Sequence, residues 1–191
     1  MSLDMILLIG LGAFLVWIYM VYAGVIKSKN KVKEAFASID VQLKKRYDLM
    51  PNILMMANKF MEHERSLIED VTKLRTEALN TKSDFGTIQN KIKLESEIQS
   101  KMGQIMVSME NYPQLKSNET MVQAMQTFSE VEEHIAAARR FYNAAILDLN
   151  NAIEIYPSSM FASSMGLTVL PYFEITSEVE KEPVNAMAYF K

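Results

Sequence analysis

The sequence predicts an all-α protein in which an N-terminal transmembrane helix precedes an up-and-down bundle of three to four long helices. Residues 5–26 carry no charge, and long stretches beyond them repeat apolar residues at helical spacing. Only five prolines and six glycines interrupt the 191 residues. We expect a transmembrane anchor over residues 1–27, a cytoplasmic antiparallel bundle over 28–157, and a tail over 158–191 that docks in part on the bundle.

The uncharged segment 5–26 is long enough to cross a membrane. As a helix it would span about 33 Å, against a hydrocarbon core of about 30 Å. A cleaved signal peptide is the alternative, because residues 21–23 resemble a cleavage site. However, a signal peptide has a basic start and a shorter apolar core, whereas this segment follows Asp4. A buried core helix would need polar positions every few residues. Aromatic rings that favour the membrane interface lie in its C-terminal half, at Trp17, Tyr19 and Tyr22.

Basic residues follow the apolar segment, and none precedes it. This asymmetry predicts that the N-terminus lies outside and that the domain beyond residue 27 lies in the cytoplasm. The first four lysines are also candidates for contact with anionic lipid head groups, at about 1 kcal/mol each. Setting topology is the simpler role, and both roles can hold. The basic residues are Lys27, Lys29, Lys31, Lys33, Lys44, Lys45 and Arg46.

A seam of apolar residues runs from Val32 to Ala78 in alternating steps of four and three. Its period of about 3.5 residues indicates helices packed lengthwise. Only Arg46 and Glu64 break the seam. The phase continues through Pro51, which bends a helix by removing one backbone hydrogen bond. We expect one long kinked helix, or two nearly collinear helices, rather than a hairpin at Pro51.

Two further long helices are predicted. Residues 84–111 carry isoleucine and methionine at helical spacing, and Pro113 ends the helix. After a cap near Asn118, residues 121–156 place a large side chain at every seventh position and alanine at most of the intervening seam positions. Small seam residues let helix axes approach more closely than the usual 8–10 Å. Pro157 ends this helix, an apolar stretch then folds back on the bundle, and the acidic end beyond residue 178 is expected to be mobile.

No catalytic, metal or cofactor site is predicted. The net charge of −3 argues against a nucleic-acid partner, and the absence of cysteine removes thiol chemistry and disulfides. His63-Glu64 begins a zinc-protease pattern, but the second histidine of that pattern would fall at Leu67. The other histidine is His134, so a three-ligand zinc site would also need a carboxylate. We expect both histidines at the surface or rim, and no enzyme activity.

Arg46 and Glu64 are the candidate buried polar residues. A charge in a core is costly unless it is paired, and 18 residues of helix would hold these two about 27 Å apart. Each therefore needs a partner elsewhere, and Arg139 and Arg140 are candidates for Glu64. Two interpretations stay open: these charges fix the register of the helices, or their side chains reach the surface by snorkelling. The acidic residues near Arg46 in sequence are Asp40 and Asp48.

Four segments resemble the LemA family. They are residues 34–64 (EAFASIDVQLKKRYDLMPNILMMANKFMEHE), 112–118 (YPQLKSN), 135–157 (IAAARRFYNAAILDLNNAIEIYP) and 162–174, which ends in Tyr-Phe-Glu. The resemblance implies a single-pass protein of the bacterial inner membrane with a cytoplasmic helical bundle. The chain departs from the family pattern at Glu133-His134, at Leu149, where tyrosine is common, and in its heavy use of methionine at core positions.

The resemblance also implies an accessory or scaffold role. A magnetosome relative is associated with membrane invagination, and some members are encoded beside a membrane metalloprotease. Our leading hypothesis is a non-enzymatic scaffold that forms a homo-oligomer, because membrane tethering raises local concentration, and that organises or shapes the inner membrane. The alternative is an adaptor or regulator of a membrane metalloprotease in protein quality control. A receptor-like signalling coil is disfavoured, because about four residues precede the anchor.

Overall fold

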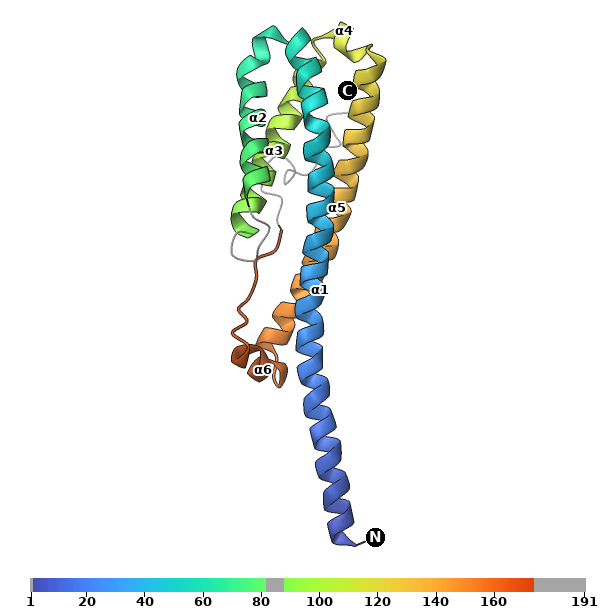
Figure 1. Cartoon of the computed structure of the whole chain (residues 1–191), viewed down its shortest axis with the longest axis vertical. Coiled ribbons are helices and arrows are strands. Elements are labelled where there is room, and N and C mark those ends of the chain that lie inside the picture. The colour runs from blue at the N-terminus through green and yellow to red at the C-terminus, as the bar shows by residue number, and fades with distance from the viewer. Residues whose placement is uncertain (1, 82–87, 174–191) are drawn as a thin grey trace, which may run out of the picture. The chain divides into compact units, whose positions relative to one another are not determined.

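The computed structural model describes residues 2–81 and 88–173, and these residues form helices and connecting turns without a strand. This confirms the all-α prediction. The predicted helix start at residues 84–87 and the acidic end beyond residue 178 lie outside the described residues. The elements, shown in Figure 1, are α1 (Leu3–Phe60), η1 (Glu62–Glu64), α2 (Arg65–Asn80), α3 (Ile88–Met109), α4 (Pro113–Lys116), α5 (Glu119–Glu154) and α6 (Ser158–Ser164).

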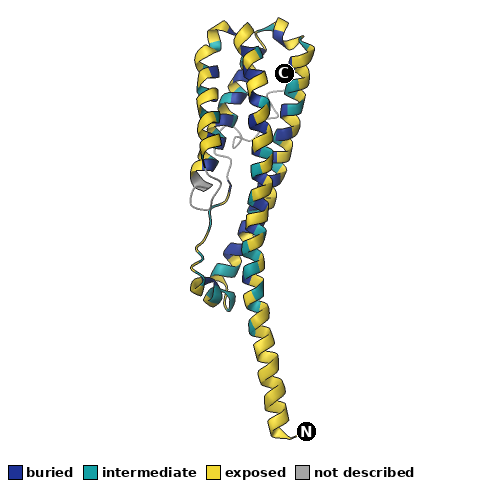
Figure 2. Ribbon diagram, viewed as in Figure 1, coloured by how far each residue is buried: buried dark blue, intermediate teal, exposed yellow. Residues whose placement is uncertain are grey.

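The chain divides into two compact units, and the long helices α1 and α5 contribute to both. Among the described residues, unit 1 contains residues 2–43 and 133–172, and unit 2 contains residues 44–81, 88–132 and 173. The buried side chains are spread along both units rather than gathered in one place (Figure 2). The boundaries expected from the sequence, after residues 27 and 157, stay predictions.

In unit 1, residues 25–43 of α1 pack antiparallel against the last part of α5. Lys31 pairs with Asp148 at 2.6 Å, and the rings of Phe36 and Tyr142 lie 6.1 Å apart. As the residue number rises on α1 it falls on α5, which defines the antiparallel register. The buried seam includes the predicted small residues of α5. Its members are Val25, Val32, Ala35, Ile39, Leu43, Ile135, Ala138, Tyr142, Ala145, Ile146, Leu149 and Ala162.

In unit 2, the chain reverses at η1 and not at Pro51. Helix α1 continues through Pro51 as far as Phe60, and Met61 then leaves the helical region with φ −110° and ψ 70°. Helix α2 runs back along α1, because the Nε of Arg75 donates to the carbonyl of Tyr47 at 2.7 Å. The prediction of one long kinked helix, or of two nearly collinear helices, from Val32 to Ala78 is therefore wrong beyond Phe60. A hairpin and a continuous helix bury the same stripe, so the period of the seam does not separate them.

The remaining helices of unit 2 follow the predicted signals. Helix α3 packs beside α2, and Lys101 pairs with Asp70 at 2.8 Å (Figure 1). Helix α3 ends shortly before Pro113, and the side chain of Asn118 accepts a hydrogen bond from the backbone N–H of Met121 at 3.1 Å. This is the geometry of an N-cap, and it starts α5 where the sequence predicted. The hairpin at η1 makes four long helices, namely α1, α2, α3 and α5, in the described part of the chain.

Candidate functional site

The N-terminal part of α1 presents apolar side chains to solvent. An 18-residue stretch of this helix has a mean hydropathy of 2.3 and no buried residue, and within the described residues α1 is the one helix long and apolar enough to cross a membrane. Figure 2 shows this end of α1 as exposed throughout. A water-soluble protein rarely exposes so large a contiguous apolar surface. The helix therefore fits a single-pass membrane protein.

Burial begins near the C-terminal end of the apolar segment. Val25 is only 1% exposed, whereas nearly every residue before Val21 is exposed. The ring of Tyr22 meets that of Phe161 edge-on, with centroids 6.1 Å apart. Tyr22 is part of α1, and Phe161 belongs to α6, which follows α5 in unit 1. Helix α6 thus contacts the last turn of the apolar stretch of α1.

The candidate lipid-contacting lysines start directly after this turn. Lys27 and Lys33 are exposed, and Lys29 and Lys31 are half-buried. The Nζ of Lys31 also forms an ion pair with Asp148 of α5, and the carboxylate partly offsets the positive charge of the lysine. A surface groove of about 540 Å³ lies at this level. Its lining combines polar and apolar side chains: Ala23, Ile26, Lys27, Asn30, Lys31, Glu34 and Phe141.

A cluster of buried charged and polar groups lies in unit 2. Both side chains of the ion pair between Arg46 and Glu95 are fully buried. The hydroxyl of Tyr47 donates to the other carboxylate oxygen of Glu95, and the second terminal nitrogen of Arg46 lies 2.9 Å from the half-buried Glu132. The cluster joins α1, α3 and α5 within this unit. Neither side chain of the Arg46–Glu95 pair reaches solvent. The arrangement is therefore typical of a contact that holds helices together and not of a substrate-binding site.

The other sequence candidates occupy varied positions. Glu64 is half-buried at the end of η1 in unit 2. Arg139 is buried and Arg140 is exposed, and both belong to the part of α5 in unit 1. Their proposed pairing with Glu64 stays a prediction. His63 and His134 are exposed, and in the described ranges no group of three or more histidine and acidic residues is arranged to hold a metal ion.

Comparison with known proteins agrees with this architecture. The profile of the LemA family matches residues 35–186, which is well over half of the chain. The chain belongs to the LemA family. The match begins inside α1, just beyond the apolar segment, so this family member is recognised by its helical domain and not by its anchor.

Three relatives of this LemA-family chain span most of its length. Protein LemA of Metamycoplasma hominis is 25% identical over 87% of this chain and 76% of its own length. Two magnetosome proteins of Paramagnetospirillum magneticum, MamQ 1 and MamQ 2, are each 21% identical over 91% of this chain and 72% of their own length.

Sequence reasoning did not single out three members of the buried cluster in this LemA-family chain, namely Tyr47, Glu95 and Glu132. The signal for Glu95 was present. Lys91, Glu95 and Ile98 fall on the buried stripe of α3, so Glu95 interrupts an apolar seam as Arg46 does. Testing every seam for such interruptions would have identified Glu95 as a buried charge, although not its pairing with Arg46. Glu132 lies at the rim of the core, where an acidic residue is ordinary.

Proposed function

We propose that this chain is a membrane-anchored, non-enzymatic scaffold that self-associates and organises or shapes the bacterial inner membrane. One observation carries the proposal: the apolar segment and the first helix of the bundle are a single helix, Leu3–Phe60. Within unit 1, this helix leaves the membrane and packs directly on α5. An anchor without a flexible linker fixes the direction in which the adjoining helices leave the bilayer, as a scaffold requires.

The proposed orientation places the N-terminus outside and the helical domain in the cytoplasm. Its support is the run of lysines after the apolar segment, which the positive-inside rule assigns to the cytoplasmic side. The chain has no cysteine, so single cysteines report topology cleanly. In intact bacterial cells, a membrane-impermeant maleimide should label a Ser2→Cys variant and should label Lys116→Cys only after lysis. The reverse pattern would overturn the orientation.

Self-association is tested by measuring mass. Full-length protein in mild detergent and a chain beginning at Ser28 would be compared by light scattering, with electron microscopy of any large species. A discrete assembly of the full-length chain supports the scaffold, and assembly of both forms would assign the interface to the helical domain. If the protein is monomeric in both detergent and lipid, the proposed self-association is contradicted. Crosslinking in cells that recovers a membrane protease, rather than further copies of the chain, would favour the adaptor role instead.

A further inference from the structure

The C-terminal part of unit 1 contains a second uncharged stretch. Residues 155–173 carry no charge, and the only longer uncharged run in the sequence is the anchor itself. We call its part in unit 1, residues 155–172, the second apolar segment. It includes α6, and several of its large side chains are exposed although they are apolar or aromatic. These are Ile155, Tyr156, Met160, Val169 and Tyr172.

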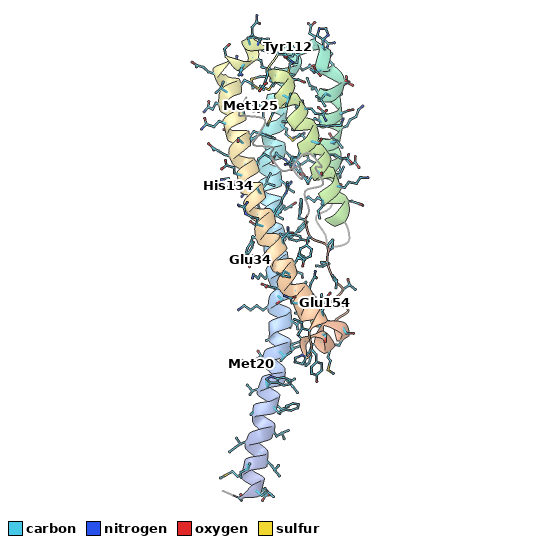
Figure 3. All side chains as sticks on the ribbon, turned by 180° about the vertical axis from the view of Figure 1, so that it is seen from behind. Met20, Glu34, Tyr112, Met125, His134 and Glu154 are labelled. Carbon is cyan, nitrogen blue, oxygen red and sulfur yellow. The ribbon has the colours of Figure 1, made fainter. Side chains whose placement is uncertain are left out.

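The register of the two long helices locates this segment. Lys31 lies opposite Asp148, and Phe36 lies opposite Tyr142. Continued in the same antiparallel register, the last residue of α5, Glu154, lies level with Val25. The chain beyond Glu154 therefore lies level with the anchor and not with the lysines that follow the anchor. Figure 3 shows α6 alongside the stretch of α1 between the levels of the labelled residues Glu154 and Met20.

The contact between Tyr22 and Phe161 confirms this level. Tyr22 lies four residues before Ile26, which is about 6 Å inside the end of the apolar run. Interfacial elements bury their apolar faces about 5–10 Å into the boundary between head groups and acyl chains. With α1 spanning a bilayer, the second apolar segment would lie at the depth of that boundary, on the side where α1 leaves the membrane. A charged segment would be costly there, and this one has no charge.

Local hydrogen bonds hold the segment in place. At the end of α6, Gly166 adopts φ +65°, and the N–H of Leu167 donates to the carbonyl of Ala162 at 3.0 Å. This pattern is a Schellman motif, which turns the chain sharply. Further on, the side chain of Asn150 on α5 both donates to and accepts from the backbone of Leu170, each at 3.0 Å. The exposed side chains are therefore displayed by a fixed turn rather than by a frayed end.

We propose that the second apolar segment is a second membrane contact, which lies in the interface of the same leaflet from which the anchor emerges. The observation that favours lipid over a protein occupant is continuity with the anchor. The segment packs on the last turn of the membrane helix, so its exposed face adjoins the surface that the bilayer covers. Tyr156 and Tyr172 suit this position, because tyrosine places its ring at the interface with its hydroxyl in water.

Spin labels on single cysteines test this contact in the full-length chain, which has no cysteine of its own. Met160→Cys and Val169→Cys variants would carry a nitroxide in proteoliposomes that contain anionic lipid. Collisions with oxygen, which partitions into lipid, would be compared with collisions with a water-soluble nickel chelate. The controls are Leu15→Cys in the middle of the anchor and Val107→Cys on α3, whose native side chain is 69% exposed, close to Met160 at 63%.

We expect the oxygen-to-nickel collision ratio at positions 160 and 169 to be several-fold above that at position 107 and below that at position 15. Ratios equal to that at position 107 would overturn the contact. Protection from both reagents together with spin–spin broadening would also overturn it, in favour of a second copy of the chain. A water-like ratio at position 15 would overturn the anchor as well. Apart from the spin–spin broadening, these outcomes do not depend on whether the protein self-associates.

A charge placed in the segment gives a second, matched test. In the Val169→Cys background, Met160→Asp should move the collision ratio at position 169 toward the value in water, because the charge draws the segment out of the interface. Val107→Asp in the same background places an equal charge on an equally exposed site and should leave the ratio unchanged. A ratio at position 169 that stays high with Met160→Asp would contradict the proposal.

Discussion

Arg46 on α1 and Glu95 on α3 form an ion pair in which neither side chain reaches solvent. Burial removes both charges from water, and this desolvation cost can exceed the attraction between them. The carboxylate gains a second donor from the hydroxyl of Tyr47, and the guanidinium gains a second acceptor at Glu132. The three helices that carry these groups therefore have one register in which both ion pairs and the hydrogen bond from Tyr47 form together. We infer that the pair specifies that register more than it adds net stability.

Breaking this pair from one side should be far more costly than replacing it. Arg46→Met or Glu95→Leu alone leaves one buried charge without its main partner, which costs about 3–5 kcal/mol of unfolding free energy. The double variant should unfold within about 1–2 kcal/mol of the parent, because it removes both desolvation costs. Chemical denaturation in mild detergent, followed by circular dichroism, measures all three values.

The matched control for this cycle is the exposed pair between Lys101 and Asp70, which are 33% and 48% exposed. Lys101→Gln should cost no more than about 1 kcal/mol, as is usual for surface pairs. If the double variant of Arg46 and Glu95 loses as much stability as the two single variants together, the two side chains stabilise the fold independently of each other, and the interpretation of the pair as a register device is wrong.

Two glycines should respond to alanine in opposite directions. Gly166 has φ +65° at the end of α6, a left-handed conformation that costs a residue with a Cβ about 1–2 kcal/mol. Gly103 lies within α3, and a Cβ added there meets no atom within 4 Å. Gly103→Ala should therefore stabilise by about 0.5–1 kcal/mol. Denaturation midpoints of both variants provide the comparison. A destabilised Gly103→Ala would show that α3 requires the absence of a side chain at this position.

The sequence predicted the parts of this fold that depend on local chemistry. The anchor followed from its lack of charge, and the start of α5 followed from the cap at Asn118. The hairpin after Phe60 could not be predicted in the same way, because no proline or glycine occurs in residues 61–64 and the apolar stripe continues in phase beyond the turn. The tertiary packing of α2 along α1 decides that reversal.

The candidate sites also separate into features that the local sequence predicts and features that depend on helix packing. Arg46 was recognisable because it interrupts a seam, whereas its partners lie 49 and 86 residues away and become neighbours only when helices pack. The apolar stretch after Pro157 was visible as composition, but its level beside Tyr22 depends on the register between α1 and α5. These pairings depend on complementary side chains from helices that are far apart in the sequence. The pattern within a single helix does not contain that information.

Stability should fall at high pH through Tyr142. Burial raises the pKa of Tyr142 from its ordinary value of 10.0 to about 12. The folded chain therefore favours the neutral phenol, so the full stability is present below pH 10 and is lost as pH rises from 10 toward 12. At about 1.4 kcal/mol per pH unit, the loss amounts to roughly 3 kcal/mol. Denaturation between pH 9 and about 12 measures this slope.

Removing the phenol tests the assignment. Tyr142→Phe should flatten the loss of stability above pH 10, because phenylalanine has no proton to release. Identical profiles for the Tyr142→Phe variant and the parent would assign the alkaline loss to other groups.

Asn150 should decide whether the second apolar segment, residues 155–172, stays docked on α5. Its buried side chain makes both hydrogen bonds to Leu170, so Asn150→Ala leaves a backbone donor and a backbone acceptor without partners, at a cost of about 1–3 kcal/mol. We expect the segment to loosen, which a nitroxide at Val169→Cys would report as a faster-tumbling spectrum. Asn151 is the exposed neighbour, and Asn151→Ala should leave that spectrum unchanged. An unchanged spectrum with Asn150→Ala would mean that the packing of Phe161 on Tyr22 and the burial of Ala162 suffice to hold the segment.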